Sequence, residues 1–458
     1  MFALSEFRAL WGAQLTSVIG DQLARVALTI LVYDRTSSAL LAAVTFMLSV
    51  VPVFIGGVTL AGLADRFPRR RVMIACDLFR CALVAVMALP GMPLALLITL
   101  LAVVTLVSAP FTAARASIYP DLLAGDNYVA GTAITLTTNQ FAQVVGFAVS
   151  GAAVALVGTR TSLVIDAATF GLSATIVAWW VRPHPAPASA LTPAGAPMPA
   201  VAEPVMRADA GSCAEPGSGG ESGAEPGTES GTESGAGPGT ESGAASGQER
   251  ASQYGGEADG GRLSGAVRMV FSTPALLLPM LFGWLAAFYN APEGVAAPLA
   301  RSLGGGAAAV GAILAAQALG ETVGMLVFGR LTRPATRLRL MGPLAIATCA
   351  VLILFLARPA FALALIILGI SGAFGAYQIA ANAAFVRAVP AHWRARAFGL
   401  AQGGMSLGQG TMIVLAGAAA QRLAPATVVA IFGGVGVVCA TGVAAGWIRS
   451  RKADAPGG

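Results

Sequence analysis

The feature that most constrains this chain is a series of apolar stretches, each about as long as a bilayer-crossing helix. A helix needs about 20 apolar residues to cross roughly 30 Å of hydrocarbon, and six such stretches precede residue 182 while six follow residue 270. They lie near residues 9–31, 39–62, 72–90, 94–114, 130–157, 161–181, 273–298, 307–328, 338–357, 360–384, 397–420 and 424–447. Backbone groups find no water to bond in lipid, so stretches of this length must be helices rather than barrel strands. We predict an all-α membrane protein with twelve transmembrane helices in two pseudo-symmetric six-helix bundles.

The composition excludes most enzyme chemistry. Only 11% of the residues are charged, against about 25% in a typical soluble protein. Lys452 is the only lysine and stands near the end of the chain, so no lysine follows a glycine-rich phosphate loop. His184 and His392 are the only histidines and are too far apart in sequence for a paired zinc motif. We therefore expect a protein that is not an enzyme and that uses no cofactor or metal.

A polar insert separates the two apolar blocks. Residues 183–261 are rich in Gly, Ser, Ala, Pro and Glu and contain 11 of the 22 acidic residues. Arg207 and Arg250 are their only basic residues, so the insert carries −9 and the remainder of the chain +15, for a total of +6. Such a segment cannot bury a core, and we expect it to be disordered. The predicted division is an N-terminal bundle over 1–182, an acidic linker over 183–262, and a C-terminal bundle with a short tail over 263–458.

The loops on the two sides of the predicted bundles differ in arginine content. The side that holds the N-terminus receives most of the basic loop residues, including the cluster from Arg69 to Arg71. The other side receives Arg35, Arg160, Arg301, Arg358 and Arg422. By the positive-inside rule the arginine-rich side is cytoplasmic, so we predict a protein of the plasma (inner) membrane whose termini and linker are cytoplasmic. Anionic lipid headgroups explain the arginine clusters without any nucleic acid.

The two halves also resemble each other. Sliding the second half back by 268 to 272 residues superposes similar residues across its whole length. The matched pairs are Gly12 with Gly283, Asp21 with Glu293, Met73 with Met341, Pro120 with Pro390, Gly131 with Gly399, and Trp179 with Trp447. A nearly fixed offset predicts duplication of a six-helix unit, an arrangement that places a transport site at the midplane between the halves.

The loop after the second span, residues 61–71, carries a resemblance. It reads Ala-Gly-Leu-Ala-Asp-Arg-Phe-Pro-Arg-Arg-Arg and resembles the signature loop of the major facilitator superfamily, which joins helices two and three. It departs from that pattern at Ala61 and Pro68, where the family usually has glycine. The resemblance implies a cytoplasmic gate latched by charge pairing. The gate residues that it implies are Asp65, Arg66, Arg69, Arg70 and Asp121.

A second motif points to drug exporters. The segment Gly-Phe-Ala-Val-Ser-Gly at residues 146–151 is similar to their glycine-rich antiporter motif, with Phe147 in place of a proline and Ser150 in place of a further glycine. Small residues also allow close helix approach in any membrane protein, so both interpretations stay open. Together with the acids in helices one and seven, the motifs resemble the branch of macrolide and siderophore exporters.

Acidic residues inside the spans are the more physical indication of function. An ionised carboxylate at the centre of a membrane helix costs about 2.5–3.5 kcal/mol on insertion scales, so each should face a cavity, pair with a cation or take up a proton. Asp21 and Arg25 are one turn apart, and Asp77 and Arg80 are spaced i, i+3, so both acids could be neutralised locally. We expect Asp166 close to the outer surface, where water would lower its cost.

Three acids are the candidates for proton coupling: Asp21, Glu293 and Glu321. Asp21 and Glu293 occupy equivalent positions beside glycines, and the seventh span also contains several prolines, which mark an interrupted helix of the kind that forms substrate sites. A carboxyl group that alternates between water and an apolar environment can exchange protons with each side. A structural hydrogen bond or contact with a cationic substrate is the alternative for each acid.

Polar and aromatic residues within the spans are candidates for the lining of a substrate cavity. They are Arg25, Trp284, Tyr289, Asn290, Gln317, Tyr377 and Gln378. A cavity of this kind suits a bulky, partly apolar molecule, although packing explains the aromatic members as well.

These patterns predict a secondary transporter that works by alternating access, in the form of a proton-driven, monomeric exporter of amphiphilic small molecules. Its partners would be the small-molecule substrate, the proton gradient and the lipid bilayer. Uptake or facilitated diffusion of a metabolite is the alternative within transport. From a different class, the chain could be a non-transporting membrane receptor whose acidic linker recruits a partner.

Overall fold

The computed structural model describes residues 5–60, 62–122, 126–182, 265, 267–390 and 393–453 of the 458-residue chain. Among these residues every regular element is a helix and no strand occurs, as the all-α prediction requires. Residues 183–262, which we predict to be an acidic linker, lie outside the described residues. The linker and the three-part division of the chain therefore stay predictions.

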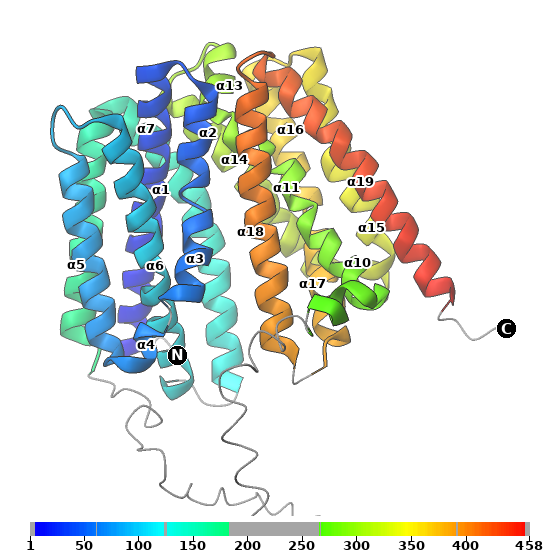
Figure 1. Cartoon of the computed structure of the whole chain (residues 1–458), viewed down its shortest axis with the longest axis horizontal. Helices are drawn as coiled ribbons and strands as arrows, with labels where there is room; N and C mark the ends of the chain where they lie inside the picture. Colours follow the sequence, from blue (N-terminus) through cyan, green and yellow to red (C-terminus); the bar gives the residue numbers. More distant parts are fainter. Residues whose placement is uncertain are drawn as a thin grey trace, which may run out of the picture. The chain divides into compact units, whose positions relative to one another are not determined.

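The N-terminal half consists of helices that follow the predicted spans (Figure 1). They are α1 (Ser5–Thr36), α2 (Ala39–Met47), α3 (Val51–Thr59), α4 (Leu63–Arg66), α5 (Arg69–Met87), α6 (Leu94–Leu122) and α7 (Asp126–Trp180). The second predicted span comprises α2 and α3, and Pro52 stands in the first turn of α3. The fifth and sixth spans together form α7, which is interrupted at Gly158. Its φ of 80° is accessible to glycine and strained for other residues.

The C-terminal half begins with a seventh span that is broken into short pieces. Its helices are α10 (Pro274–Trp284), α11 (Ala286–Tyr289), α12 (Ala291–Gly294), α13 (Ala296–Ser302), α14 (Ala307–Leu331), α15 (Pro334–Leu352), η2 (Ile353–Ala357), α16 (Phe361–Phe374), α17 (Tyr377–Ala388), α18 (Arg394–Ala419) and α19 (Pro425–Ala453). Pro279 lies inside α10 and Pro292 in the first turn of α12. Proline lacks an amide hydrogen and so removes a helical hydrogen bond. The division of the seventh span into short helices confirms the interruption expected from the sequence.

The described helices account for twelve spans. Nine segments are individually long and apolar enough to cross a membrane. One of the nine, Thr137–Trp180, contains the Gly158 interruption and so holds two spans. The two further long helices are α5, which carries Asp77 and Arg80, and α18, which is rich in glycine and glutamine. With these helices the described part of the chain matches the predicted number.

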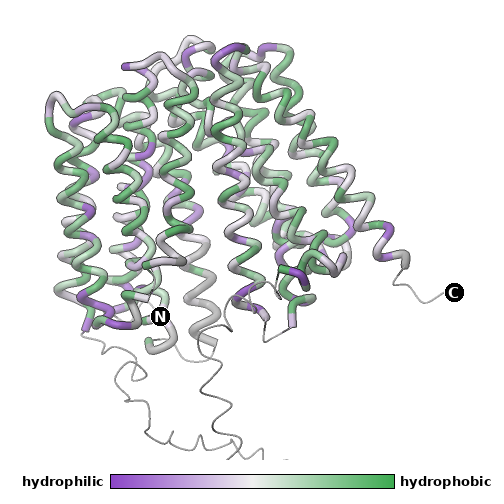
Figure 2. Tube along the Cα trace, in the orientation of Figure 1, coloured by the Kyte–Doolittle hydropathy of each residue, from purple (hydrophilic) through white to green (hydrophobic). Residues whose placement is uncertain are grey.

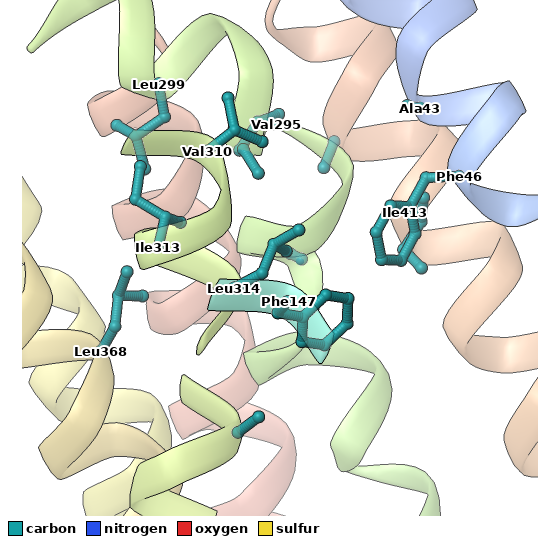
Figure 3. Packing of buried hydrophobic residues seen from close by; sticks show 14 of the residues in the cluster. Ala43, Phe46, Phe147, Val295, Leu299, Val310, Ile313, Leu314, Leu368 and Ile413 are labelled. Carbon is teal, nitrogen blue, oxygen red and sulfur yellow. The ribbon is translucent and has the colours of Figure 1, made fainter. Parts of the chain in front are cut away.

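Buried apolar side chains join the two halves at one end of the helices. Phe147 of α7 lies in the same large cluster as Ile313 of α14 and Ile413 of α18 (Figure 3). Two smaller clusters each stay within one half, one around Phe7 and the other around Phe385. The smaller clusters lie at the end where α1 begins and where α7 and α17 finish. The halves thus share a core at one end and have separate cores at the other.

The outer surface of the helices is apolar. Figure 2 shows hydrophobic residues along most of each helix, with many of the hydrophilic ones near the helix ends. Several large apolar side chains are mostly exposed, such as Leu156 at 85% and Val438 at 73%. Exposed apolar surface of this extent is typical of a face covered by lipid.

Candidate functional site

A cavity of about 780 Å³ lies between the two halves. Residues of α1, α3 and α7 line one side of it, and residues of α11, α12, α14, α17 and α18 line the other. Its charged lining residues are Arg25, Glu293 and Glu321. We call it the central cavity; it occupies the position between the halves that the duplicated sequence predicts for a transport site.

Glu293 and Glu321 bring two carboxylates to this cavity from the C-terminal half. Glu293 follows Pro292 in α12, so the break in the seventh span places it at the wall. Glu321 lies on α14, where Gly372 of α16 approaches so closely that a Cβ atom on Gly372 would be 2.9 Å from the Glu321 nitrogen. Among the described residues neither glutamate has an ion pair. Two carboxyl groups that line one cavity between membrane helices favour uptake of a proton or a cation.

Arg25 is the cation of the central cavity. Its Nη2 donates a hydrogen bond to the Ser49 carbonyl at 3.1 Å, and its guanidinium lies over the Phe46 ring at 5.5 Å from the centroid. Arg25 also lines a smaller cavity inside the N-terminal half, together with Asp21. It therefore stands between the acid of helix one and the acids of the C-terminal half.

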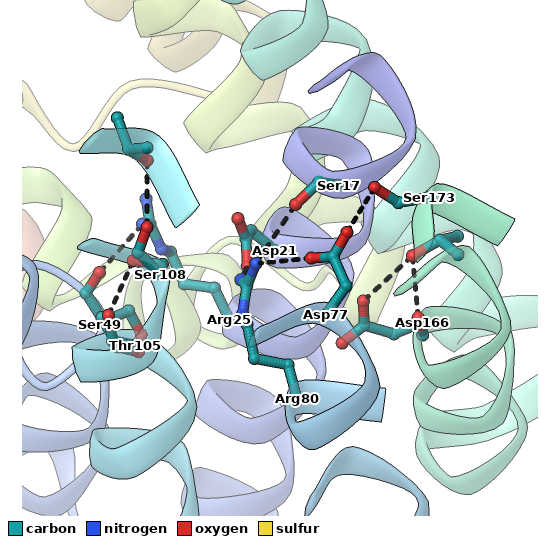
Figure 4. A network of polar contacts seen from close by, with 12 residues as sticks. Ser17, Asp21, Arg25, Ser49, Asp77, Arg80, Thr105, Ser108, Asp166 and Ser173 are labelled. Carbon is teal, nitrogen blue, oxygen red and sulfur yellow. Dashed lines mark hydrogen bonds and ion pairs between the residues drawn. The ribbon is translucent and has the colours of Figure 1, made fainter. Parts of the chain in front are cut away.

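Asp21 belongs to an ion-pair network on the inner side of the N-terminal half (Figure 4). Its carboxylate is paired with Arg80 of α5, which also lies 3.8 Å from the Asp77 carboxylate and donates a 3.2 Å hydrogen bond to the Ser17 hydroxyl. The Ser173 hydroxyl donates to Asp77 at 2.6 Å. The predicted pairing of Asp77 with Arg80 is confirmed. The expected local partner of Asp21 is wrong, because the ion pair of Asp21 is with Arg80, 59 residues away, instead of Arg25.

Asp166 is also placed differently from the expectation. We expected it in contact with outer water, but it is completely buried in α7. Thr169 donates to one of its oxygens at 3.4 Å, and the other oxygen has no hydrogen-bond partner in the described chain. Gly20 of α1 packs directly against it, because any Cβ atom on Gly20 would clash with Asp166 and Thr169.

The predicted cavity residues divide into lining and packing groups. Tyr289, Asn290 and Gln378 line the central cavity. Gln317 is buried behind them, where its amide donates to the Asn290 side chain at 2.7 Å. Tyr377 is fully buried and donates to the Phe282 carbonyl at 3.0 Å, so its role is packing.

Trp284 lines a neighbouring cavity of about 630 Å³ instead, and its indole donates to the Ala401 carbonyl at 2.9 Å. Met280, Phe385 and Phe398 also line this second cavity, and none of its lining residues in the described part of the chain is charged. It shares Gln140, Gln378 and Gln402, among others, with the central cavity, so the two adjoin.

Four glutamines of the central cavity were missed by the sequence analysis. They are Gln140 and Gln143 of α7 and Gln402 and Gln409 of α18. Each pair is spaced by three or seven residues within an apolar helix, a spacing that places both members on one face. Amide side chains on one face of a membrane helix were the available signal.

The cytoplasmic gate implied by the signature loop is only partly described. The side chains of Asp65 and Asp121 lie outside the described residues, so the proposed charge pairing stays a prediction. Arg66 is exposed. Arg70 donates to the Ala178 carbonyl of α7, which holds the start of α5 against the end of α7.

The opposite end is closed by contacts between the halves. Asp34 at the end of α1 forms a 2.6 Å ion pair with Arg301 of α13, and Gln421 donates to Ser38 at 2.9 Å. Deeper in, the glycine-rich segment of α7 crosses α14. A Cβ atom on Gly311 would lie 2.7 Å from the Gly151 Cα, so only glycines permit this approach. Close packing is therefore one use of the exporter-like motif.

Comparison with known proteins agrees with this architecture. The family model described as Major Facilitator Superfamily matches residues 10–292 and 294–457. No curated protein sequence matches the chain.

Among solved structures, a POT family transporter in complex with 5-aminolevulinic acid superposes with a TM-score of 0.65 at 10% identity, covering 96% of this chain and 95% of the other. A bacterial homolog of the human lysosomal transporter Spinster gives 0.60 at 15% identity, with 97% and 96% covered. The nucleoside transporter NupG gives 0.59 at 15% identity, with 97% and 99% covered. At such identities the similarity is one of fold.

Proposed function

The chain belongs to the major facilitator superfamily and is a multi-pass membrane transporter of small molecules, and we propose that it is a proton-coupled exporter of amphiphilic molecules. One observation carries this proposal. Glu293 and Glu321 face a cavity lined by both halves and have no ion pair among the described side chains. In a membrane helix such carboxylates mark proton or ion pathways.

The proton step follows from the position of these acids. When the cavity opens to water on one side, the glutamates can release a proton; when the halves close around it, a retained charge is costly and a proton or cationic group is bound. Asp21 remains the third candidate. Its bond with Arg80 would have to loosen before it exchanged a proton.

The chemistry of the cavity walls supports an amphiphilic substrate. Amide side chains line the central cavity together with the two glutamates, and the adjoining second cavity adds Trp284, Phe385 and Phe398. Apolar walls with a few polar groups are typical of small-molecule sites. A bulky molecule with one polar end fits this combination, in agreement with the exporter branch that the motifs resemble.

Transport would proceed by rocking of the two halves around the central cavity. The ion pair of Asp34 with Arg301 and the glycine crossing at Gly311 hold the outer end closed. When the end at Asp34 and Arg301 opens, the opposite end of the cavity would have to close. The signature-loop residues, with Asp65 and Asp121, would form that closure. We propose that the latter end faces the cytoplasm of the plasma membrane, as the arginine distribution indicates, and that a single chain suffices.

A resistance and accumulation assay tests this function. The chain is produced in a bacterial host that lacks its own multidrug exporters, and cells are exposed to a panel of amphiphilic antibiotics and dyes. We expect cells that produce the chain to accumulate less of some compounds than cells without it. A protonophore should abolish this difference, and so should Glu293→Gln at equal expression. Higher accumulation in the presence of the chain would identify an uptake carrier, and no change for any compound would contradict export of amphiphiles.

A further inference from the structure

The central cavity adjoins two side chambers with different chemistry. The first, of about 310 Å³, lies in the N-terminal half and shares Arg25, Gln140 and Gln143 with the central cavity. We call it the arginine chamber. The second is the 630 Å³ cavity around Trp284, which we call the aromatic chamber. Gln140 lines all three spaces, so they adjoin one another at this side chain.

The arginine chamber contains an unpaired buried cation. Its charged lining residues are Asp21, Arg25, Arg80 and Arg115. Asp21 is already paired with Arg80. Arg115 of α6 is only 9% exposed, its Nε is buried without a hydrogen-bond partner, and no ion pair or hydrogen bond joins its guanidinium to any described residue.

An unpaired guanidinium in this position favours binding of an anionic group. Removing a charge from water is costly unless a counter-charge compensates it. A guanidinium presents a planar set of donors that matches the two oxygens of a carboxylate or phosphate. The Gln140 and Gln143 amides line the same chamber and can donate further hydrogen bonds.

The other two spaces complement different parts of a ligand. Among the described residues, two carboxyl groups, Glu293 and Glu321, and one guanidinium, Arg25, line the central cavity, so it favours an ammonium group. None of the described residues that line the aromatic chamber is charged, and Trp284, Phe385 and Phe398 form an apolar wall there. An anion site, a cation site and an apolar site thus adjoin one another.

We propose that the transported amphiphile is a zwitterion with an acidic group bound by Arg115, an ammonium group facing Glu293 and Glu321, and an apolar body in the aromatic chamber. This assignment rests on the proposed export function and narrows its substrate class. The ammonium group competes with protons for the two glutamates, as antiport requires. The acidic group at Arg115 fixes the orientation of the molecule.

Three probes with one aromatic body test the assignment by direct binding to the purified full-length protein. They are 3-(2-naphthyl)alanine, a zwitterion; its amide, which keeps the ammonium group; and its N-acetyl derivative, which keeps the acid. Binding is measured by titration calorimetry at neutral pH. We expect the zwitterion to bind at least about tenfold more tightly than either other probe, since loss of one partner of a buried charge pair is costly.

Variants then assign each charge to its site. Arg115→Gln is expected to lower the affinity for the zwitterion to that for the amide. Arg115→Lys is expected to restore part of the difference in affinity between the two probes. Glu293→Gln should lower the affinity for the zwitterion toward the affinity for the N-acetyl derivative. Arg160→Gln, which changes an exposed arginine of α7, serves as the matched control and should preserve the ranking of the probes.

Several outcomes would overturn the proposal. If the amide and the zwitterion bound equally to the unaltered protein, the proposed anion site would be contradicted, whatever the variants showed. Equal weakening of both probes by Arg115→Gln would reduce Arg115 to a structural residue, and absence of saturable binding by all three would exclude an aromatic zwitterion. Binding requires no proton gradient, so the ranking of the probes can hold where export fails, and export of other amphiphiles can hold where the ranking fails.

Discussion

The two halves of the molecule share a six-helix plan but treat their buried acids differently. In the N-terminal half, Arg80 is paired with Asp21 and lies next to Asp77. In the C-terminal half, Glu293 and Glu321 face the central cavity, and no described side chain forms an ion pair with either. A duplicated frame thus holds Asp21 and Asp77 beside Arg80 within one half, and Glu293 and Glu321 open to a shared space.

The difference indicates a division of labour. Carboxylates that are bonded to an arginine stabilise one arrangement of helices, because separating the pair leaves a buried charge without compensation. Carboxylates without a fixed partner remain available for a proton or a cationic ligand. We therefore assign mechanical rigidity mainly to the N-terminal half and proton exchange mainly to the C-terminal half.

The largest effect on stability is expected at Arg80. Arg80→Gln leaves Asp77, which is fully buried, without its cation, so the free energy of unfolding should fall by about 3–5 kcal/mol. Thermal unfolding in detergent measures the loss. Adding Asp77→Asn to the same chain should recover part of it, and Arg160→Gln should change little. A small effect of Arg80→Gln would show that the network does not hold the half together.

The glycine crossing between the halves comes next. Gly311→Ala places a Cβ atom 2.6 Å from the Phe147 carbonyl, which should disfavour the closed outer end by about 1–3 kcal/mol. Spin labels at Thr36→Cys and Ser302→Cys, in a background without the natural cysteines, report the separation of the halves. In Gly311→Ala we expect an additional population in which the two labels are farther apart than in the unaltered protein. Gly329→Ala on the same helix has its nearest atom at 3.9 Å and is the control; equal effects would contradict a role for the crossing.

The ion pair at the closed end of the molecule should contribute less. Asp34 and Arg301 are about half exposed, so removing the pair is expected to shift the same distance distribution by only about 0.2–1 kcal/mol. High salt should mimic Arg301→Gln by screening. Exchange of the two charges in Asp34→Arg with Arg301→Asp should restore the distribution. If the exchanged pair behaved like the single variants, the ion pair would not contribute to closure.

The smallest effect is expected from the acidic linker. Removal of residues 190–255 shortens a connection that adds little closure entropy with length, so the stability of the helical body should change by less than about 1 kcal/mol. Thermal unfolding in detergent and transport activity are the measurements. A marked loss of stability would contradict a tether, and loss of output with intact folding would favour the receptor alternative.

The fold was largely predictable because its signals are local. Apolar length marks the spans, and prolines mark the broken seventh span. The i, i+3 spacing likewise identified the pair of Asp77 with Arg80. Each of these inferences depends on residues within one helix or on the solvent preference of a whole segment.

The site was less predictable because it is assembled across helices. The partner of Asp21 is 59 residues away, and the depth of Asp166 depends on how α7 packs against α1. The role of Arg115 becomes visible only from the position of α6, which brings Arg115 to the wall of the arginine chamber. Helical periodicity gives the face of each residue but not the neighbour that the face meets.

Proton movement during transport tests the central assignment most directly. The protein is reconstituted into liposomes that contain a pH-sensitive dye, and an exported compound from the accumulation assay is added under an opposing concentration gradient. We predict that substrate movement drives protons in the opposite direction, and that Glu293→Gln with Glu321→Gln abolishes this while substrate still binds. Substrate flux without proton movement, or unchanged proton movement in the double variant, would contradict the account.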